Sequence, residues 1–149
     1  MKTDDSTMAI RWINRSDLDD VLSIEQQSYP APMTRIELMD WLTSSDCICL
    51  VYESQGRIAG FVMYLLIGTT WLIQDLAVDP AFRFQGVASE LIDYLKLGVR
   101  HSQGKIICSV RTNNLPALKL FKKHGFGLVE KFNSKQSKES FVRLRYAAE

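Results

Sequence analysis

The segment from Arg83 to Ser89 holds the residue types that most directly suggest a binding chemistry. It follows an apolar run and places Gly86 and Ala88 at the start of a helical pattern. Small residues leave backbone amides accessible, and the first turn of a helix presents unpaired N–H groups with partial positive charge. With the added charge of Arg83, this arrangement suits a pyrophosphate group. A glycine at a helix start also suits close packing of the helix entry, so both explanations stay open.

Metal and disulfide chemistry receive little support from the sequence. The three cysteines, Cys47, Cys49 and Cys108, do not form a disulfide framework, and the first two are too close together for the usual zinc spacing. The two histidines, His101 and His124, lie far apart without a cluster of carboxylates or thiols around them. We therefore expect no metal site, packing roles for the cysteines, and a reducing compartment.

The elements that must position these residues follow from apolar periodicity and turn signals. The predicted order is βααβββαβαββ. The strands are expected within 8–14, 47–52, 58–67, 71–78, 105–111, 126–132 and 141–146, and the helices after Ser16, after Thr34, from Gly86 to Gly104, and from Asn114 to Lys123. We predict an α/β (α+β) fold, with a mixed sheet of about seven strands flanked by about four helices, in one domain spanning residues 1–149. The piece from Trp71 to Arg111 is the expected parallel crossover.

Local sequence signals indicate where some of these helices and strands begin and end. Ser16 with an acid three residues later, and Thr34 with Glu37, predict two helix N-caps. Residues 55 and 56 predict a hairpin turn. The mostly apolar run 71–78 indicates a strand buried on both faces.

The composition excludes several classes of function. With 18 basic and 17 acidic side chains, the chain lacks the basic excess of charge-driven nucleic-acid binders. The lysines at 119, 122, 123, 135 and 138 are better explained as solvated helix and loop faces. No apolar run approaches the roughly 20 residues of a membrane helix, and the polar start lacks a signal-peptide core. We expect a cytoplasmic protein with no membrane or nucleic-acid partner.

The same loop resembles a known cofactor-binding element. Arg83-x-x-Gly86-x-Ala88 matches the Q/R-x-x-G-x-G/A motif of the GNAT superfamily of acyl-CoA N-acyltransferases, and the preceding Leu-Ala-Val-Asp-Pro is also typical of it. The block Val-Arg-x-Asn-Asn at 110–114 resembles the superfamily's second motif. Within the superfamily, this block and the segment 29–34 are most similar to the bacterial ribosomal-protein alanine N-acetyltransferases. The resemblance covers nearly the whole chain in element order.

The resemblance implies a coenzyme A thioester, acetyl-CoA, as the donor. Its pyrophosphate would rest on the amides from Arg83 to Ser89, and its pantetheine arm would pair like an added strand with residues 76–78, where the two parallel strands splay apart. The backbone N–H of Val78 would polarise the thioester carbonyl and stabilise the oxyanion. Asn114 would either bind the cofactor arm or cap the following helix. The implied cofactor-binding residues are Leu76, Ala77, Val78, Arg83, Phe84, Gln85, Gly86, Val87, Ala88, Ser89, Asn114 and Phe121.

The catalytic residues of the resembled subgroup are missing from this chain. Where the ribosomal-protein enzymes have a glutamate base and a tyrosine acid, this chain has Ser109 and Phe121, and at the other familiar base position it has Leu72. Neither Ser109 nor Phe121 can take over these roles at neutral pH. Asp75, facing opposite to Gln74, is the only carboxylate that we expect within reach, but a structural hydrogen-bond acceptor explains it better than a catalytic role. Other hydroxyl or imidazole groups, which the sequence does not place, are Tyr29, Tyr64, Tyr146 and His124.

These losses restrict the acceptor. An α-amino group loses its proton more easily than a lysine by about 2.4 pKa units, or roughly 3.3 kcal/mol, so solvent can remove it. We therefore expect an N-acetyltransferase that acts on a peptide N-terminus or another primary amine of low pKa, by direct transfer through a tetrahedral intermediate. The alternative is a non-catalytic acyl-CoA-binding regulatory domain. The oligomeric state, monomer or homodimer, stays open.

Overall fold

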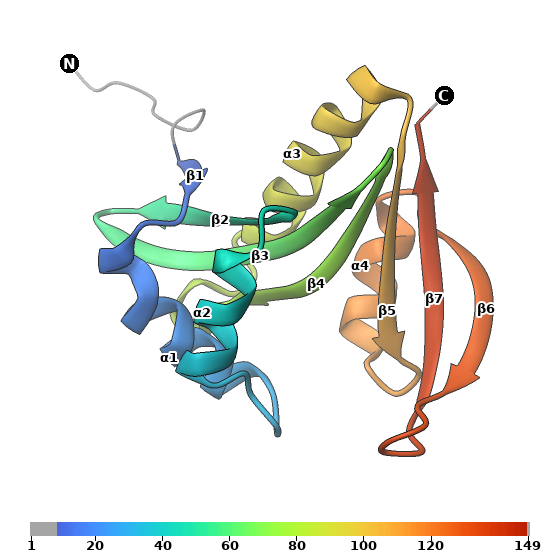
Figure 1. Cartoon of the computed structure of the whole chain (residues 1–149), viewed down its shortest axis with the longest axis horizontal. Coiled ribbons are helices and arrows are strands. Elements are labelled where there is room, and N and C mark those ends of the chain that lie inside the picture. The colour runs from blue at the N-terminus through green and yellow to red at the C-terminus, as the bar shows by residue number, and fades with distance from the viewer. Residues whose placement is uncertain (1–8, 149) are drawn as a thin grey trace. The chain divides into compact units, whose positions relative to one another are not determined.

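The computed structural model describes residues 9–148, and its elements follow the predicted order (Figure 1). Seven strands and four α-helices are present in this range. The strands are β1 (Ile10–Trp12), β2 (Cys47–Ser54), β3 (Arg57–Ile67), β4 (Thr70–Val78), β5 (Lys105–Arg111), β6 (Gly127–Asn133) and β7 (Ser140–Ala147), and the helices are α1 (Leu18–Ser28), α2 (Arg35–Thr43), α3 (Val87–Ser102) and α4 (Leu115–Lys123). Short 3-10 helices, η2 and η3, cover Arg15–Asp17 and Pro80–Phe82.

The strands form one mixed sheet in the order β1-β2-β3-β4-β5-β7-β6. The pairs β1–β2, β2–β3, β5–β7 and β6–β7 are antiparallel. The expected parallel crossover is confirmed, because Thr70–Leu72 of β4 pairs in parallel with Lys105–Ile107 of β5. The predicted fold class is therefore confirmed.

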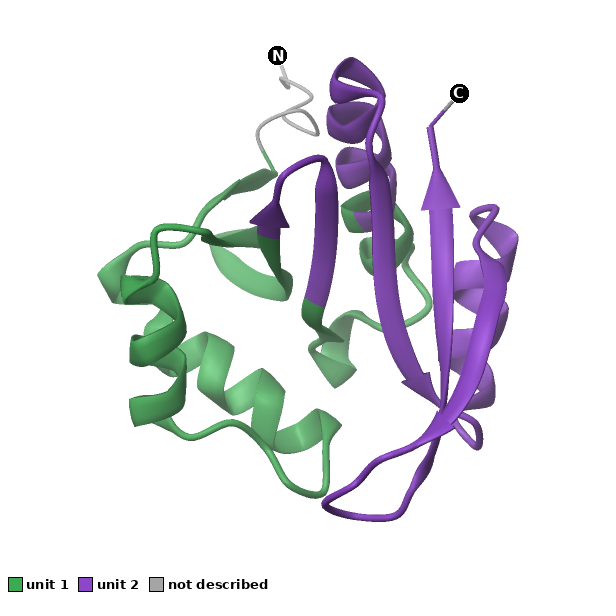
Figure 2. Ribbon diagram, turned by 45° about the vertical axis from the view of Figure 1, so that its right-hand side comes forward, with its two compact units in different colours: residues 1–65, 74–91 green, residues 66–73, 92–149 purple. Residues whose placement is uncertain are grey.

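The chain divides into two compact units (Figure 2). The first unit comprises residues up to 65 together with 74–91, and the second comprises 66–73 together with 92–149. Strands β3 and β4 and helix α3 each begin in one unit and continue in the other.

The core of the first unit forms where α1 and α2 pack on β2 and β3. Alternate strand residues point to this core, since Cys49 and Val51 of β2 and Phe61 and Met63 of β3 are at most 2% exposed. This spacing is the two-residue period of a strand. The helices contribute one apolar face, through the buried side chains of Leu18, Val21, Leu22, Ile24 and Leu38.

Turn and cap chemistry fix the ends of these elements. Thr34 and Glu37 form the predicted capping box of α2, with both reciprocal hydrogen bonds present. The turn between β2 and β3 has positive φ at both Gln55 and Gly56, which matches the twist of a two-residue hairpin. The expected cap at Ser16 is wrong: the side chain of Asn14 accepts from the Ser16 amide, and Asn14 forms the capping box with Asp17 at the start of η2.

The second unit buries an aromatic and aliphatic core between α4 and the last strands. Phe121 packs edge-on against Phe126, with 5.0 Å between ring centroids, and Phe126 lies 5.7 Å from the ring of Tyr146. The predicted burial of Cys108 is confirmed, as is the final hairpin. His124 ends α4 as its C-cap, which confirms a helix-end position. Its Nδ1 lies 3.2 Å from Asp93, and burial lowers its pKa.

Strand β4 is less buried than the sequence indicates. Only Ile73 and Ala77 of β4 are buried, whereas Gln74 is exposed and Leu72, Leu76 and Val78 are half-buried. The expectation of burial on both faces is therefore wrong. An apolar run shows that a strand tolerates burial, but it does not show that another layer covers its second face.

Gly60 of β3 allows the end of β4 and the start of α3 to approach closely. A Cβ atom at this position would lie 2.9 Å from the carbonyl oxygen of Ala77 and 2.9 Å from Cγ1 of Val87. Both distances are shorter than side chains tolerate, and the first involves backbone. The absence of a side chain at residue 60 is thus a condition for the β3–β4–α3 packing in the first unit.

We predict that Gly60→Ala lowers the free energy of unfolding by about 1–3 kcal/mol, because the added methyl group must displace backbone of β4. Gly127→Ala serves as the matched control, since a Cβ on this exposed strand glycine meets nothing within 4 Å. Urea denaturation of both variants measures the difference. Equal stability of the two variants would contradict the predicted crowding at Gly60.

Candidate active site

The loop between β4 and α3 is held firmly where it leaves β4. The amide of Asp79 donates to the carbonyl of Ala59 (2.8 Å), and the Asp79 carboxylate accepts from the amide of Ala81 (2.8 Å). Arg57 adds a cation whose guanidinium lies 3.8 Å from Asp79 and 5.1 Å above the ring of Phe82. These contacts anchor η3, which leads directly into Arg83.

The loop residues after Arg83 have an unusual backbone conformation. Both Phe84 (φ 64°) and Gly86 (φ 80°) adopt the left-handed region, and Phe84 is fully exposed. A bulky residue with positive φ is strained, and such strain is frequent at ligand-binding loops. Within residues 9–148, the backbone amides of Phe84, Gln85 and Gly86 donate to no acceptor. The amides of this loop and of the first turn of α3 fit the chemistry of a bound pyrophosphate.

The first turn of α3 is tied to the sheet of the first unit. Glu90 donates its amide to the carbonyl of Gly86 (2.9 Å), which closes the first turn after the loop. The carboxylate of Glu90 accepts from the hydroxyl of Tyr52 on β2 (2.9 Å). Gly60 lies close to Ala77, which precedes the loop, and to Val87, which follows it. The loop is therefore held at both of its ends.

Two carboxyl groups meet beside β4. Glu25 of α1 is 4% exposed, and its Oε2 accepts from the amide of Met33 (2.8 Å) in the connection between α1 and α2. Its Oε1 is also buried, and no N–H or O–H of the described residues donates to it. Asp75 of β4 lies within hydrogen-bonding reach of Glu25, and burial together with this neighbouring carboxyl raises the pKa of Asp75 to about 9. A proton on Asp75 would supply the donor that Glu25 Oε1 lacks.

Tyr29 completes this group. Its hydroxyl donates to the carbonyl of Leu76 (2.5 Å) and lies within reach of Asp75. Burial raises the pKa of Tyr29 further above its ordinary value, so this phenol stays neutral. The structure thus brings together Glu25, Tyr29 and Asp75, which come from α1, the segment after it, and β4.

The remaining candidates lie elsewhere. In the second unit, Ser109 is exposed on β5 and Phe121 is buried in the aromatic core. Asn114 caps α4, because its Oδ1 accepts from the amide of Ala117 (3.2 Å). Tyr146 lies under the ammonium of Lys96, which is 4.8 Å from the ring centroid. No three metal-ligating side chains converge within residues 9–148.

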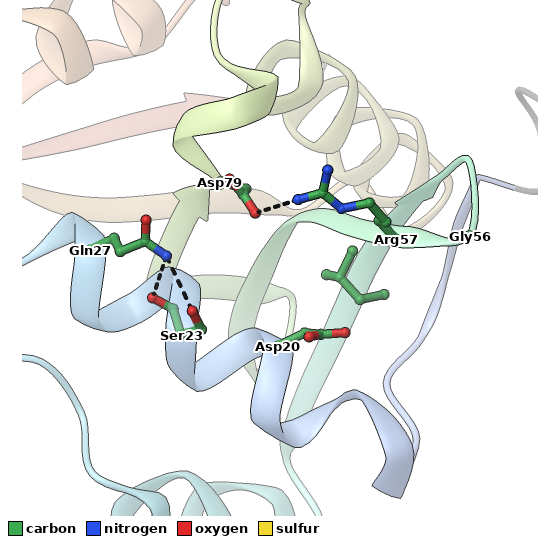
Figure 3. A pocket seen from close by; sticks show the side chains of 7 residues that line it. Asp20, Ser23, Gln27, Gly56, Arg57 and Asp79 are labelled. Carbon is green, nitrogen blue, oxygen red and sulfur yellow. Dashed lines mark hydrogen bonds and ion pairs between the residues drawn. The ribbon is translucent and has the colours of Figure 1, made fainter.

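A polar cavity of about 340 Å³ also opens in the first unit (Figure 3). Its lining comes from α1, the β2–β3 turn, the start of β3 and the residue after β4, and consists of Asp20, Ser23, Gln27, Gly56, Arg57, Ile58 and Asp79. The amide of Gln27 turns back to Ser23, at 3.1 Å from its hydroxyl, and Arg57 points to Asp79 (Figure 3). The polar groups of this cavity are therefore largely used within its wall.

Glu25 is the residue of this site that sequence reasoning missed. It lies on the same helix face as Leu18, Val21 and Leu22, so the periodicity places a carboxylate among core positions. A buried acid on an apolar helix face is costly unless it is paired, which is the signal that could have identified it. Its partner, Asp75, is 50 residues away in the sequence, and no local pattern connects the two.

Comparison with known proteins adds an independent line of observation. Two curated relatives are each 28% identical to this chain: a Bacillus subtilis protein over 119 residues, covering 78% of this chain and 79% of its own length, and a Haemophilus ducreyi protein over 124 residues, covering 80% and 83%. The second is named a ribosomal protein bS18 alanine N-acetyltransferase, and the first bears that name provisionally.

The fold is shared with a solved enzyme as well. The ribosomal-protein-S18-alanine N-acetyltransferase from Escherichia coli superposes with a TM-score of 0.82 at 18% identity, covering 93% of this chain and 92% of that one. Within residues 9–148, no helix is both long and apolar enough to span a membrane. Residues 11–126 match the acetyltransferase (GNAT) family, and the chain therefore belongs to this family of N-acetyltransferases.

Proposed function

We propose that this N-acetyltransferase moves the acetyl group of acetyl-CoA to the N-terminal α-amino group of a protein, of the kind represented by ribosomal protein bS18. The observation on which the proposal rests is the match to two relatives named for acetylation of the bS18 alanine, over about four fifths of each chain. Because acetyl-CoA and ribosomal proteins meet in the cytoplasm, we assign the reaction to that compartment. The three cysteines of the chain form no disulfide, which is compatible with it.

We assign the cofactor contacts to the loop and strand residues predicted from the sequence. The pyrophosphate would lie on the amides from Arg83 to Ser89, and the left-handed backbone of Phe84 and Gly86 within this segment supports the assignment. The pantetheine arm would follow Leu76 and Ala77 of β4, and the amide of Val78 would polarise the thioester carbonyl. Asn114 and Phe121 are retained as predicted contacts, although Asn114 also caps α4 and Phe121 is buried.

The proton chemistry supports an α-amine over a lysine. Neither the exposed hydroxyl of Ser109 nor the phenyl ring of Phe121 can act as a base. An acceptor that loses its proton near neutral pH makes a strong base unnecessary, and an α-amino group does so about 2.4 pKa units below a lysine. Positioning and polarisation of the thioester would then provide most of the rate enhancement.

We predict thiol release from acetyl-CoA with peptides that begin with a free alanine, and none above background with the same peptides when the N-terminus is acetyl-capped and a lysine is the remaining amine. The physical reason is the lower pKa of the α-amino group. Release of free thiol, with the acetylated position read by mass spectrometry, measures both reactions. Equal rates on the capped lysine peptides would exclude the proposed acceptor class.

We predict that Gly86→Ala weakens acetyl-CoA binding about tenfold, equivalent to roughly 1.4 kcal/mol, because an alanine resists the left-handed conformation that the loop requires. Gly68→Ala is the matched control: Gly68 also has positive φ (61°) and open space at Cβ, but it lies in the β3–β4 turn. Calorimetric titration of acetyl-CoA compares the two variants. The same loss of affinity in both, or in neither, would contradict a role of this loop in cofactor binding.

A further inference from the structure

We propose that Glu25 and Asp75 share one proton and that Asp75 delivers this proton to the sulfur that leaves the thioester. Glu25 acts through Asp75 and is a positioning residue. The inference takes the N-acetyltransferase activity as given and does not depend on which amine is the acceptor. Asp75 would thereby act as the general acid, a role that the phenyl ring of Phe121 cannot fill.

The burial of Glu25 requires a proton donor near it. One oxygen of its carboxylate is satisfied by the Met33 amide, but the other is buried without a donor when both acids are ionised. Two adjoining ionised carboxylates would repel each other in a site of low polarity, so one of them retains a proton. A proton on Asp75 gives Glu25 Oε1 the hydrogen-bond donor that it lacks. Asp75 is also the less buried of the two carboxyl groups.

The other titratable groups around the pair stay neutral. Tyr29 approaches from the segment after α1, and Cys49 approaches from β2. Burial raises the pKa of both groups, and the nearby carboxyls add to the effect. Cys47 and Asp17 also contribute to the raised pKa of Cys49. The Glu25–Asp75 pair is therefore the group of this cluster that exchanges a proton under ordinary conditions.

The position of Asp75 suits transfer to the thioester. It immediately precedes Leu76, Ala77 and Val78, which we assign to the pantetheine arm and the oxyanion. Tyr29 holds the carbonyl of Leu76 on one side, so the hydroxyl and the acid lie at the same point of β4. Burial and the neighbouring carboxyl raise the pKa of Asp75 toward that of an ordinary thiol, at about 8.5, which lowers the free-energy cost of passing the proton to the sulfur.

The proton balance closes over one turnover. The acceptor ammonium first loses a proton to solvent, and the free amine attacks the thioester carbonyl to form a C–N bond. As the C–S bond breaks, the proton of Asp75 passes to the sulfur to give the thiol. The nitrogen, still carrying one proton in excess, returns a proton to the pair. The Glu25–Asp75 pair therefore ends in the state in which it began.

The direction of the pH dependence follows from the pKa of Asp75. Because this pKa is raised, the acid form is present below about pH 9 and is lost as the pH rises through that value. The rate constant kcat should fall on the alkaline side accordingly. Removing the second carboxyl removes the repulsion, so the pKa of Asp75 should fall and the alkaline limb should move toward neutral pH.

The test compares Glu25→Gln, Asp75→Asn and, as a matched control, Asp20→Asn, which changes an exposed carboxylate of the same helix. We expect Glu25→Gln to move the alkaline limb of kcat by at least about one pH unit, and Asp75→Asn to lower kcat by about 10²-fold or more with the limb abolished. The KM for acetyl-CoA should stay unchanged in both. Asp20→Asn should retain the wild-type profile.

Infrared spectroscopy provides a readout that does not depend on turnover. The C=O stretch of a protonated carboxyl group should be present in the free protein at neutral pH, disappear near pH 9, and be missing in Asp75→Asn. An unmoved alkaline limb in Glu25→Gln, near wild-type kcat in Asp75→Asn, or no protonated carboxyl signal at neutral pH would each overturn the proposal. Profiles are measured with the most rapidly acetylated amine, whether α-amine or lysine, so an error in the acceptor class does not affect the result.

Discussion

The buried carboxyl group of Glu25 is the constraint on which the first unit depends. It lies on the apolar face of α1, where an unpaired charge would cost several kcal/mol. The fold meets this cost by placing three segments around one side chain: α1 itself, the connection to α2 through the Met33 amide, and β4 through Asp75. The position of the α1–α2 connection is therefore linked to the protonation of Asp75. The same carboxyl group of Glu25 takes part both in the packing of this unit and in the proposed proton transfer.

The loop between β4 and α3 shows a different arrangement, in which strained residues at its centre are held by contacts at both of its ends. Its unfavourable backbone at Phe84 and Gly86 is possible because both ends are fixed, by Asp79 and Arg57 before the loop and by Gly60 behind it. A loop whose backbone is fixed in this way would lose less conformational entropy when it binds a ligand. The backbone conformation of the loop therefore depends on residues that lie outside its centre.

The sequence predicts what depends on local pattern. The element order, the capping box at Thr34 and Glu37, the turn at Gln55 and Gly56, and the loop motif all rest on residues within a few positions of each other, and the structure has each of them. The sequence does not predict the exposed side of β4, because exposure depends on whether another layer covers the strand. It also does not predict the cap at Asn14, because Asn14 and Ser16 are competing cap residues close together in the chain. The Glu25–Asp75 contact could not be found in this way, since it joins residues brought together only by packing of α1 on the sheet.

The missing acid and base at Ser109 and Phe121 need not mean a loss of catalysis. Phe121 packs against Phe126 in the aromatic core of the second unit and has no hydroxyl to donate. The first unit contains the proposed substitute donor, a carboxyl group held protonated by its neighbour. A low-pKa acceptor amine removes the need for a strong base, and a raised-pKa acid replaces the tyrosine, so both substitutions are compatible with the same reaction. In this chain, proton transfer would then depend on the packing of α1 against β4.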